Sequence, residues 1–341
     1  MKNPRRAYFF PPFGSPFHPP AGRIEERPYF PGTKGTVALK YIKSVFFFVN
    51  IILLASSAVA RAAPGCTSDG LVCMEAITAT GARGVDLWLE SKRPGAITIT
   101  LEQTAENLSP ATDVPLEINL TGPKRQLVAE LRALHADVSW KHSFRFHCMS
   151  GNKFAVPDME YVYGIPFAPG QPVRVSQGFH GRFSHSDLGN MYAVDFDVPE
   201  NTPVYAAREG IVIELEQAFT TGGPAEPLEN ANAVRIQHSD GTIGEYGHLR
   251  FNGAAVKVGQ VIRKGDLVAY SGNTGRSTGP HLHFDVHVPM SGQISKSIPI
   301  QFYVGETVAK ILEEGSRYQR PALELPTNNR MPASAVSVSS R

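Results

Sequence analysis

The sequence has little of what long helices or nucleic-acid binding would require. Long amphipathic helical patterns are almost absent, and 27 prolines and 31 glycines interrupt short alternating runs, which is typical of β-rich chains with many turns. A net charge of +2 over 341 residues is too small to indicate nucleic acid as a partner. With 42% hydrophobic and 19% charged residues, the chain is a globular protein long enough for two domains. The composition therefore predicts an all-β protein of two domains.

Cysteine is scarce as well. Only Cys66, Cys73 and Cys148 are present, and all three precede the histidine-rich half of the chain, so we expect no cysteine-held zinc there. An odd count leaves one cysteine outside any disulfide. Alternation of Leu71 with Cys73 and of Phe146 with Cys148 predicts that both cysteines point into one core. Spacing leaves a Cys73–Cys148 bridge and a Cys66–Cys73 bridge equally open.

Long apolar runs are also rare, and the single one lies at residues 45–55. It follows Lys40 and Lys43 and leads into the small residues of 58–63, an order typical of a secretory signal and its cleavage site. The run is shorter than the roughly 20 residues that a membrane-spanning helix needs. We therefore expect a signal peptide at 37–63 and export to the periplasm or cell envelope.

The residues before this signal do not fit it, because signals begin shortly before their basic region. Residues 1–36 are rich in Pro, Phe and Arg, and we interpret them as a doubtful extension from a mis-assigned start, with Val37 as the true one. The mature chain is then expected to begin between Arg61 and Pro64.

Short strands follow between residues 64 and 165. Turn signals at Arg93-Pro94-Gly95 and Thr121-Gly122-Pro123 separate runs in which every second residue is apolar: Val85, Leu87 and Leu89; Ile97, Ile99 and Leu101; Leu116, Ile118 and Leu120. This pattern predicts a small antiparallel β-sandwich as an accessory domain at 64–165.

The second half, residues 166–305, carries the candidate chemistry. Gly279 to His287 reads as a strand with an apolar face of Leu282, Phe284 and Val286, and an opposite face of His281, His283, Asp285 and His287. Two histidines two residues apart on a rigid strand can converge on a metal ion. A histidine-rich surface strand is the alternative.

Other polar residues of this half fall on further strands and loops. Asp195 shares one face of the strand Tyr192 to Val198 with Asp197, and a buried carboxylate requires a partner such as a metal ion or a salt bridge. His185 lies ten residues earlier in a polar loop, and His248 ends a later strand.

Glycine turns join short strands in two segments of this half. The segment 203–212 echoes the pattern of 256–275, which indicates a weak internal duplication of a β-barrel-like fold.

Separated motifs, in the same order, resemble the lysostaphin-type zinc endopeptidases of the peptidoglycan wall over residues 165–305. The matching stretches are Gln177-Gly178-Phe179 through Ser184-His185, Ala193-Val-Asp195-Phe, Pro203 to Gly210, Tyr246-Gly-His248-Leu, and Gly272-Asn-Thr-Gly275 through His281-Leu-His283-Phe. The resemblance implies a lysostaphin-type β-sheet catalytic domain after the β-sandwich.

The resemblance also implies roles for individual residues. His185, Asp195 and His283 match the zinc ligands, for one Zn²⁺ per chain, and His248 and His281 match the catalytic histidines. The family's usual first motif places its aspartate four residues after its histidine, whereas here the interval is ten.

The longer interval leaves His180 as a rival first ligand. Two histidines and a carboxylate suit a catalytic zinc that keeps a fourth position for water. Because the chain has no His-Glu-x-x-His motif, a glutamate base has no candidate. His281 can take the proton of the attacking water while His248 binds the developing oxyanion, or the two roles are exchanged.

The activity implied is that of a zinc metalloendopeptidase hydrolysing peptide cross-links of cell-wall peptidoglycan. Its partners would be the peptide stems and other wall-remodelling proteins, with no nucleic acid. A catalytically silent regulator of wall hydrolases with the same fold is the alternative. A biotinyl or lipoyl carrier is a third reading, but the lysine that it needs at a hairpin tip has no candidate.

The C-terminal segment, residues 306–341, is less informative. The run from Gly305 to Glu314 predicts one short helix capped by Gly315, and beyond Arg320 a Pro- and Ser-rich tail predicts disorder.

Overall fold

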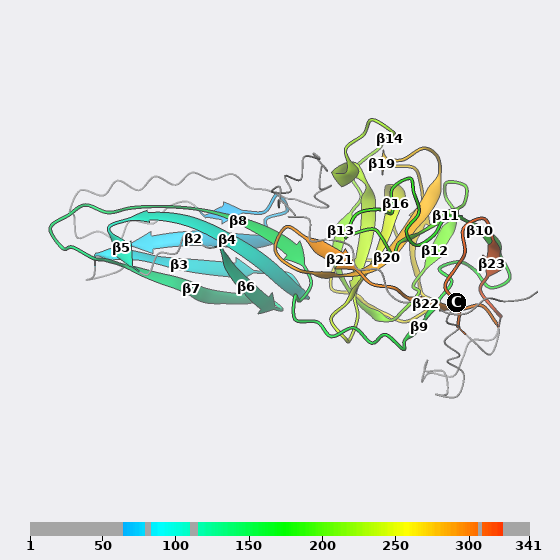
Figure 1. Ribbon diagram of the computed structural model, residues 1–341, viewed down its shortest axis with the longest axis horizontal. Coiled ribbons are helices and arrows are strands. Elements are labelled where there is room, and N and C mark those ends of the chain that lie inside the picture. Colours follow the sequence, from blue (N-terminus) through cyan, green and yellow to red (C-terminus); the bar gives the residue numbers. More distant parts are fainter. Residues whose placement is uncertain (1–63, 79–82, 110–114, 306–308, 323–341) are drawn as a thin grey trace, which may run out of the picture. The chain divides into compact units, whose positions relative to one another are not determined.

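The computed structural model describes residues 64–78, 83–109, 115–305 and 309–322 (Figure 1). These residues form strands and loops, and a single turn of 3-10 helix, η1 (Leu228–Asn230), is the only helix among them. The predicted all-β class is confirmed.

Several predicted segments lie outside the described residues: the extension at 1–36, the signal peptide at 37–63 and the tail from residue 323. Among the residues described, no helix is long and apolar enough to cross a membrane.

The N-terminal strands form two antiparallel sheets, drawn in blue to green in Figure 1. The five-stranded sheet has the order β1-β2-β3-β7-β5, and the three-stranded sheet has the order β6-β4-β8. The bounds are β1 (Gly65–Cys66), β2 (Val72–Thr78), β3 (Gly84–Ser91), β4 (Ala96–Glu106), β5 (Leu108–Ser109), β6 (Leu116–Thr121), β7 (Lys124–Ala133) and β8 (Lys141–Ser150).

Both sheets contribute to one hydrophobic cluster. Val85, Leu87 and Leu89 of β3 are fully buried, as are Ile97, Ile99 and Leu101 of β4, so the period-2 pattern correctly predicted the inward faces. Leu116, at the start of β6, is an exception with 37% of its surface exposed.

The prediction that Cys73 points into the core was wrong. Val72 and Met74 are fully buried, so Cys73 points away from the core rather than into it. Cys73 pairs across the strands with Cys66 of β1, at a Cα–Cα distance of 4.1 Å, and the two form a disulfide. Cys148, on β8 of the other sheet, remains outside the disulfide. Of the two bridges that spacing left open, the structure has Cys66–Cys73.

The rest of the chain builds around an 11-stranded sheet. Its strands are β10 (Pro172–Gln177), β11 (Val194–Asp197), β12 (Pro203–Tyr205), β13 (Gly210–Glu216), β15 (Asn232–Gln237), β16 (Ile243–Ala254), β17 (Val261–Ile262), β18 (Leu267–Ser271), β20 (His281–Pro289), β21 (Ser295–Ser297) and β23 (Arg317–Gln319). Two small parallel pairs accompany it: β9 (Val162–Gly164) with β22 (Gln301–Tyr303), and β14 (Gly222–Gly223) with β19 (Gly275–Arg276).

The main path of this sheet runs β17-β13-β15-β16-β20-β11-β10-β23. β20 is central, between β16 and β11, and its apolar residues Leu282, Phe284 and Val286 are fully buried in a second hydrophobic cluster. The opposite face of β20 is therefore left to its histidines and Asp285, as the alternation predicted.

The two segments with similar glycine patterns lie side by side. β12 pairs with β18, and β13 pairs with β17, so strands of 203–212 meet strands of 256–275 in antiparallel register.

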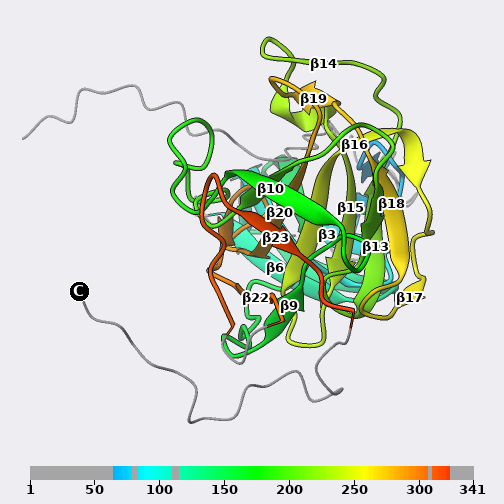
Figure 2. The same ribbon diagram turned by 90° about the vertical axis from the view of Figure 1, so that its right-hand side faces the viewer.

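The short helix expected from Gly305 to Glu314 is wrong for its described part. Lys310 instead forms an isolated bridge with Phe302, and Gly315 takes a φ of 85° in a turn. The chain then continues as β23, which lies beside β10 (Figure 2). Main-chain pairing with the sheet thus outweighs the modest helical pattern of this segment.

Candidate metal centre

The candidate ligands come together because β11 and β20 are hydrogen-bonded neighbours. Asp195 of β11 lies directly opposite His283 of β20, and its Oδ1 is 2.9 Å from His283 Nδ1. Side chains directly opposite each other on antiparallel strands share one face of the sheet. The register between distant strands therefore joins two residues that are 88 positions apart.

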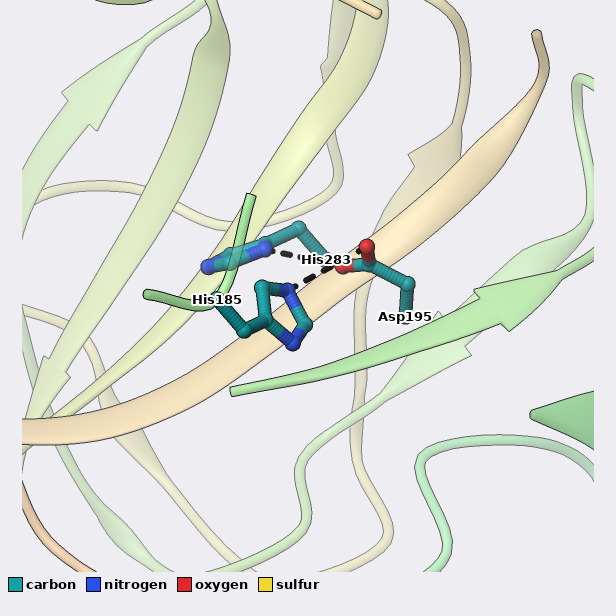
Figure 3. A group of neighbouring side chains, drawn as sticks. All are labelled: His185, Asp195 and His283. Carbon is teal, nitrogen blue, oxygen red and sulfur yellow. Dashed lines mark hydrogen bonds and ion pairs between the residues drawn. The ribbon is translucent and has the colours of Figure 1, made fainter. Parts of the chain in front are cut away.

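His185 reaches the same point from the loop between β10 and β11 (Figure 3). Its Nδ1 donates to the main-chain oxygen of Gly178 at 2.8 Å, and its Nε2 faces Asp195 Oδ2 at 3.2 Å. One nitrogen or oxygen of each of His185, Asp195 and His283 lies within 4.8 Å of the others, and all three residues are buried. The three residues singled out by sequence thus form one cluster.

The donor atoms of this cluster fit a metal ion. A neutral His185 that donates from Nδ1 carries only a lone pair at Nε2, and this buried atom has no hydrogen-bond partner. A lone pair and a carboxylate oxygen facing each other in a buried site call for a cation between them. Two imidazoles and one carboxylate are also a ligand set that zinc accepts.

Asp195 is held in its ionised form. Burial alone would raise the pKa of its carboxyl group, but protons on the facing nitrogens of His185 and His283 more than offset burial and hold that pKa well below its usual range, and a cation in the place of those protons acts in the same direction. An ionised carboxylate is the form that binds a metal ion.

Gln177 supports both the loop and the aspartate, a role that the sequence did not reveal. Its Nε2 donates to Asp195 Oδ2 at 3.0 Å, and its Oε1 accepts from the main-chain nitrogens of Phe183 and Ser184. The only sequence signal was its place at the start of the first matching motif.

His180, the rival first ligand, lies apart from the cluster. It does not belong to the group of potential metal ligands formed by the described residues around Asp195. Its ring instead packs edge-on against Tyr192, with 5.1 Å between the ring centroids. The structure therefore favours His185 over His180.

The two candidate catalytic histidines lie against each other beside the cluster. The ring centroids of His248 and His281 are 4.5 Å apart, and His281 Nε2 lies 4.0 Å from Asp195 Oδ1. Each ring donates its Nδ1 proton to a main-chain oxygen, His248 to Thr274 at 2.7 Å and His281 to Gly279 at 2.8 Å. In the neutral form of each ring, Nε2 therefore carries the lone pair.

His248 is in an unusual backbone conformation. Its φ of 57° is left-handed, and the pairing of β16 with β15 shifts register next to it. Such strain in a non-glycine residue persists where surrounding contacts enforce it, often at functional sites. Burial, followed by the neighbouring His281 and His283, lowers the pKa of His248 to about 3, so its ring is neutral at neutral pH.

A cleft of about 660 Å³ opens onto these groups. Its lining includes Asp195, His248, His281 and His283, together with the aromatic side chains of Phe179 and Phe183. His185, only 1% exposed, lies behind this lining. The cleft thus gives a ligand access to the cluster and to both histidines.

Comparison with known families agrees with this geometry. Residues 189–297 match the model of Peptidase family M23, which confirms the resemblance to lysostaphin-type peptidases. The matched range includes Asp195, His248, His281 and His283, but begins after His185. The place of His185 in the cluster therefore rests on the structure.

Curated relatives are similar over the same part of the chain. Peptidoglycan DD-endopeptidase ShyA of Vibrio cholerae is 31% identical over 144 residues, which are 38% of this chain and 31% of that protein. Glycyl-glycine endopeptidase ALE-1 of Staphylococcus capitis is 39% identical over 98 residues, 28% of this chain and 24% of that protein. An uncharacterized metalloprotease of Haemophilus influenzae is 37% identical over 118 residues, 34% of this chain and 23% of that protein. The chain thus spans less than a third of the length of each of these relatives.

Proposed function

We propose that this chain, which carries a segment matching Peptidase family M23, is a zinc metalloendopeptidase that hydrolyses peptide cross-links of cell-wall peptidoglycan. One observation carries the proposal: the cluster of His185, Asp195 and His283 lies next to His248 and His281 at a single cleft. Within the cluster, the buried Nε2 of His185 has no hydrogen-bond partner. Relatives named as peptidoglycan DD-endopeptidases support the substrate class.

His185, Asp195 and His283 would hold the zinc ion. The chemistry that a bound zinc ion supplies is the polarisation of an amide carbonyl and a pKa of water lowered toward about 7. Gln177, which donates to Asp195 and holds the loop of His185, fixes the relative positions of two of these ligands.

His248 and His281 would transfer the proton of the attacking water. Because both rings use Nδ1 to donate to main-chain oxygens, both present a proton-accepting Nε2. The ring that takes a proton from the attacking water then becomes a donor, able to stabilise the oxyanion or protonate the leaving amine. Either His248 or His281 can begin this sequence, since their tautomers are the same.

Export to the periplasm or cell envelope belongs to the same proposal, because the substrate lies there. The names of the relatives refer to different peptide bonds, DD bonds in one case and glycyl-glycine bonds in another. The proposal therefore covers peptide cross-links in general and not one particular bond. Other wall-remodelling proteins are proposed partners.

Digestion of purified sacculi tests the proposal. The full chain loaded with zinc should release fragments that mass analysis identifies as products of a cut peptide bond, and His281→Ala should release them far more slowly. A chain that binds zinc and cuts no sacculus, yet stimulates a separate hydrolase, would instead be the catalytically silent regulator.

A further inference from the structure

A row of charged side chains crosses four neighbouring strands beside the metal centre. Glu214 of β13 lies opposite Arg235 of β15, Arg235 lies opposite Glu245 of β16, and Glu245 lies opposite Asp285 of β20. The Arg235 guanidinium bridges the two glutamates, at 3.1 Å to Glu214 and 2.9 Å to Glu245. The row therefore ends at Asp285, which lies two residues after His283 on β20.

Asp285 links this row to the metal centre. Its side chain is fully buried between two imidazoles, with Oδ2 at 3.0 Å from His283 Nε2 and Oδ1 at 2.6 Å from His287 Nδ1. A neutral imidazole has one N–H, and an ionised carboxylate only accepts. Donation from His283 Nε2 to Asp285 therefore leaves a lone pair at Nδ1, the nitrogen that faces Asp195.

Packing does not explain a carboxylate at this position. A fully buried charge is costly, and apolar residues of similar size are often as stabilising or more so. A carboxylate that accepts from the far nitrogen of a ligating histidine, by contrast, fixes the tautomer and orientation of the ring. The observed contacts of Asp285 match this second arrangement.

A second metal ion is a competing explanation, because ligand atoms of Glu245, His283 and Asp285 also lie within 4.8 Å of one another. However, Glu245 already accepts from Arg235, and Asp285 already contacts His287. A guanidinium so close to the site opposes a further cation. The contacts thus favour a positioning role over a second ion.

We propose that Asp285 is a positioning residue, which sets the tautomer and orientation of His283 so that Nδ1 is presented to the metal ion. Glu245 lies opposite it on β16, Arg235 lies one strand further on β15, and His287 contacts its second oxygen. The inference rests on the proposed metal centre and assigns to it a residue that the matching motifs did not single out.

Zinc affinity of the purified full chain, measured by competition with a chromophoric chelator, tests this role. Asp285→Ala removes the acceptor and should weaken zinc binding by about 10–100-fold. Asp285→Asn keeps the shape of the side chain and one neutral acceptor, so it should weaken zinc binding less than Asp285→Ala does. If Asp285→Ala does not fold, a measurable loss of affinity in Asp285→Asn carries the test, and wild-type affinity there would overturn the proposal.

Asp240→Asn is the matched control, because Asp240 is a carboxylate with 10% side-chain exposure, paired with Arg208 at 2.8 Å and absent from the cleft lining. It should lower stability but leave zinc affinity unchanged. Equal losses of zinc affinity in the control and in Asp285→Ala would mean that both substitutions act by destabilising the whole fold. That result would overturn the role of Asp285.

The wild-type chain separates the remaining outcomes. One zinc ion per chain is expected. No zinc in the wild type would defeat the proposed function itself, whereas zinc binding that Asp285→Ala leaves intact would defeat only the positioning role. Two ions per chain, with one lost in Asp285→Ala, would assign Asp285 to a second metal site instead.

Discussion

Asp195 and His283 lie directly opposite each other on β11 and β20, with 2.9 Å between Oδ1 and Nδ1. If this pair and His185 hold zinc, His283→Ala should lose both the metal and peptidoglycan hydrolysis, because two ligands do not retain a catalytic zinc ion. Metal content by atomic absorption and sacculus digestion check this outcome. His180→Ala is the control and should keep its zinc, since His180 lies outside the cluster; loss of zinc in that variant would restore His180 as a ligand.

His248→Ala and His281→Ala should separate catalysis from metal binding. If both residues act on protons through Nε2, as proposed, each variant should retain about one zinc per chain while hydrolysis falls by about 10²–10⁴-fold. The measurement pairs metal content with the initial rate of fragment release. A variant that loses its zinc along with its activity would assign that histidine to the metal instead.

The Cys66–Cys73 disulfide should stabilise the N-terminal strands. In the chain-entropy model, closing so short a loop contributes about 2–3 kcal/mol, and replacing both cysteines by alanine should lower the free energy of unfolding by that amount. Denaturant titration measures it.

Thiol labelling checks the pairing of the cysteines independently. Labelling of unreduced, denatured protein should modify Cys148 alone, and labelling after reduction should modify all three cysteines. Labelled Cys66 in the unreduced sample would contradict the bridge.

Acid should destabilise the protein through His238. Burial, followed by the nearby Arg208 cation, lowers the pKa of His238 in the folded state to about 4 from an ordinary 6.5. Between these values the unfolded chain binds a proton that the folded chain does not, so stability falls as the pH drops from about 6.5 to about 4. The shift corresponds to about 3 kcal/mol at most.

His238→Gln isolates this contribution. Glutamine can replace the donor that His238 Nδ1 offers to the main-chain oxygen of Glu209, and it does not titrate. Urea unfolding at several pH values should show a flatter profile for this variant than for the wild type. His135→Gln, at an exposed position, should keep the wild-type profile; equal profiles for wild type and His238→Gln would contradict the assignment.

The sequence by itself determined the strands and their faces wherever side chains alternate strictly. Leu282, Phe284 and Val286 had to face a core because burial of apolar surface drives folding, and the strand period of two then sent His281 and His283 to the other face. The motifs likewise singled out the three candidate metal ligands and the two candidate catalytic histidines before any contact was known.

The tertiary structure decided everything that depends on which distant segments pair. Spacing could not choose the partner of Cys73, because the answer lay in its register with Cys66. Nor could it find the contact of Asp285 with His283 Nε2, or predict that the segment after Gly305 continues to a strand beside β10. Periodicity is a property of neighbours along the chain, whereas register is set by the summed packing and hydrogen bonding of strands far apart in sequence.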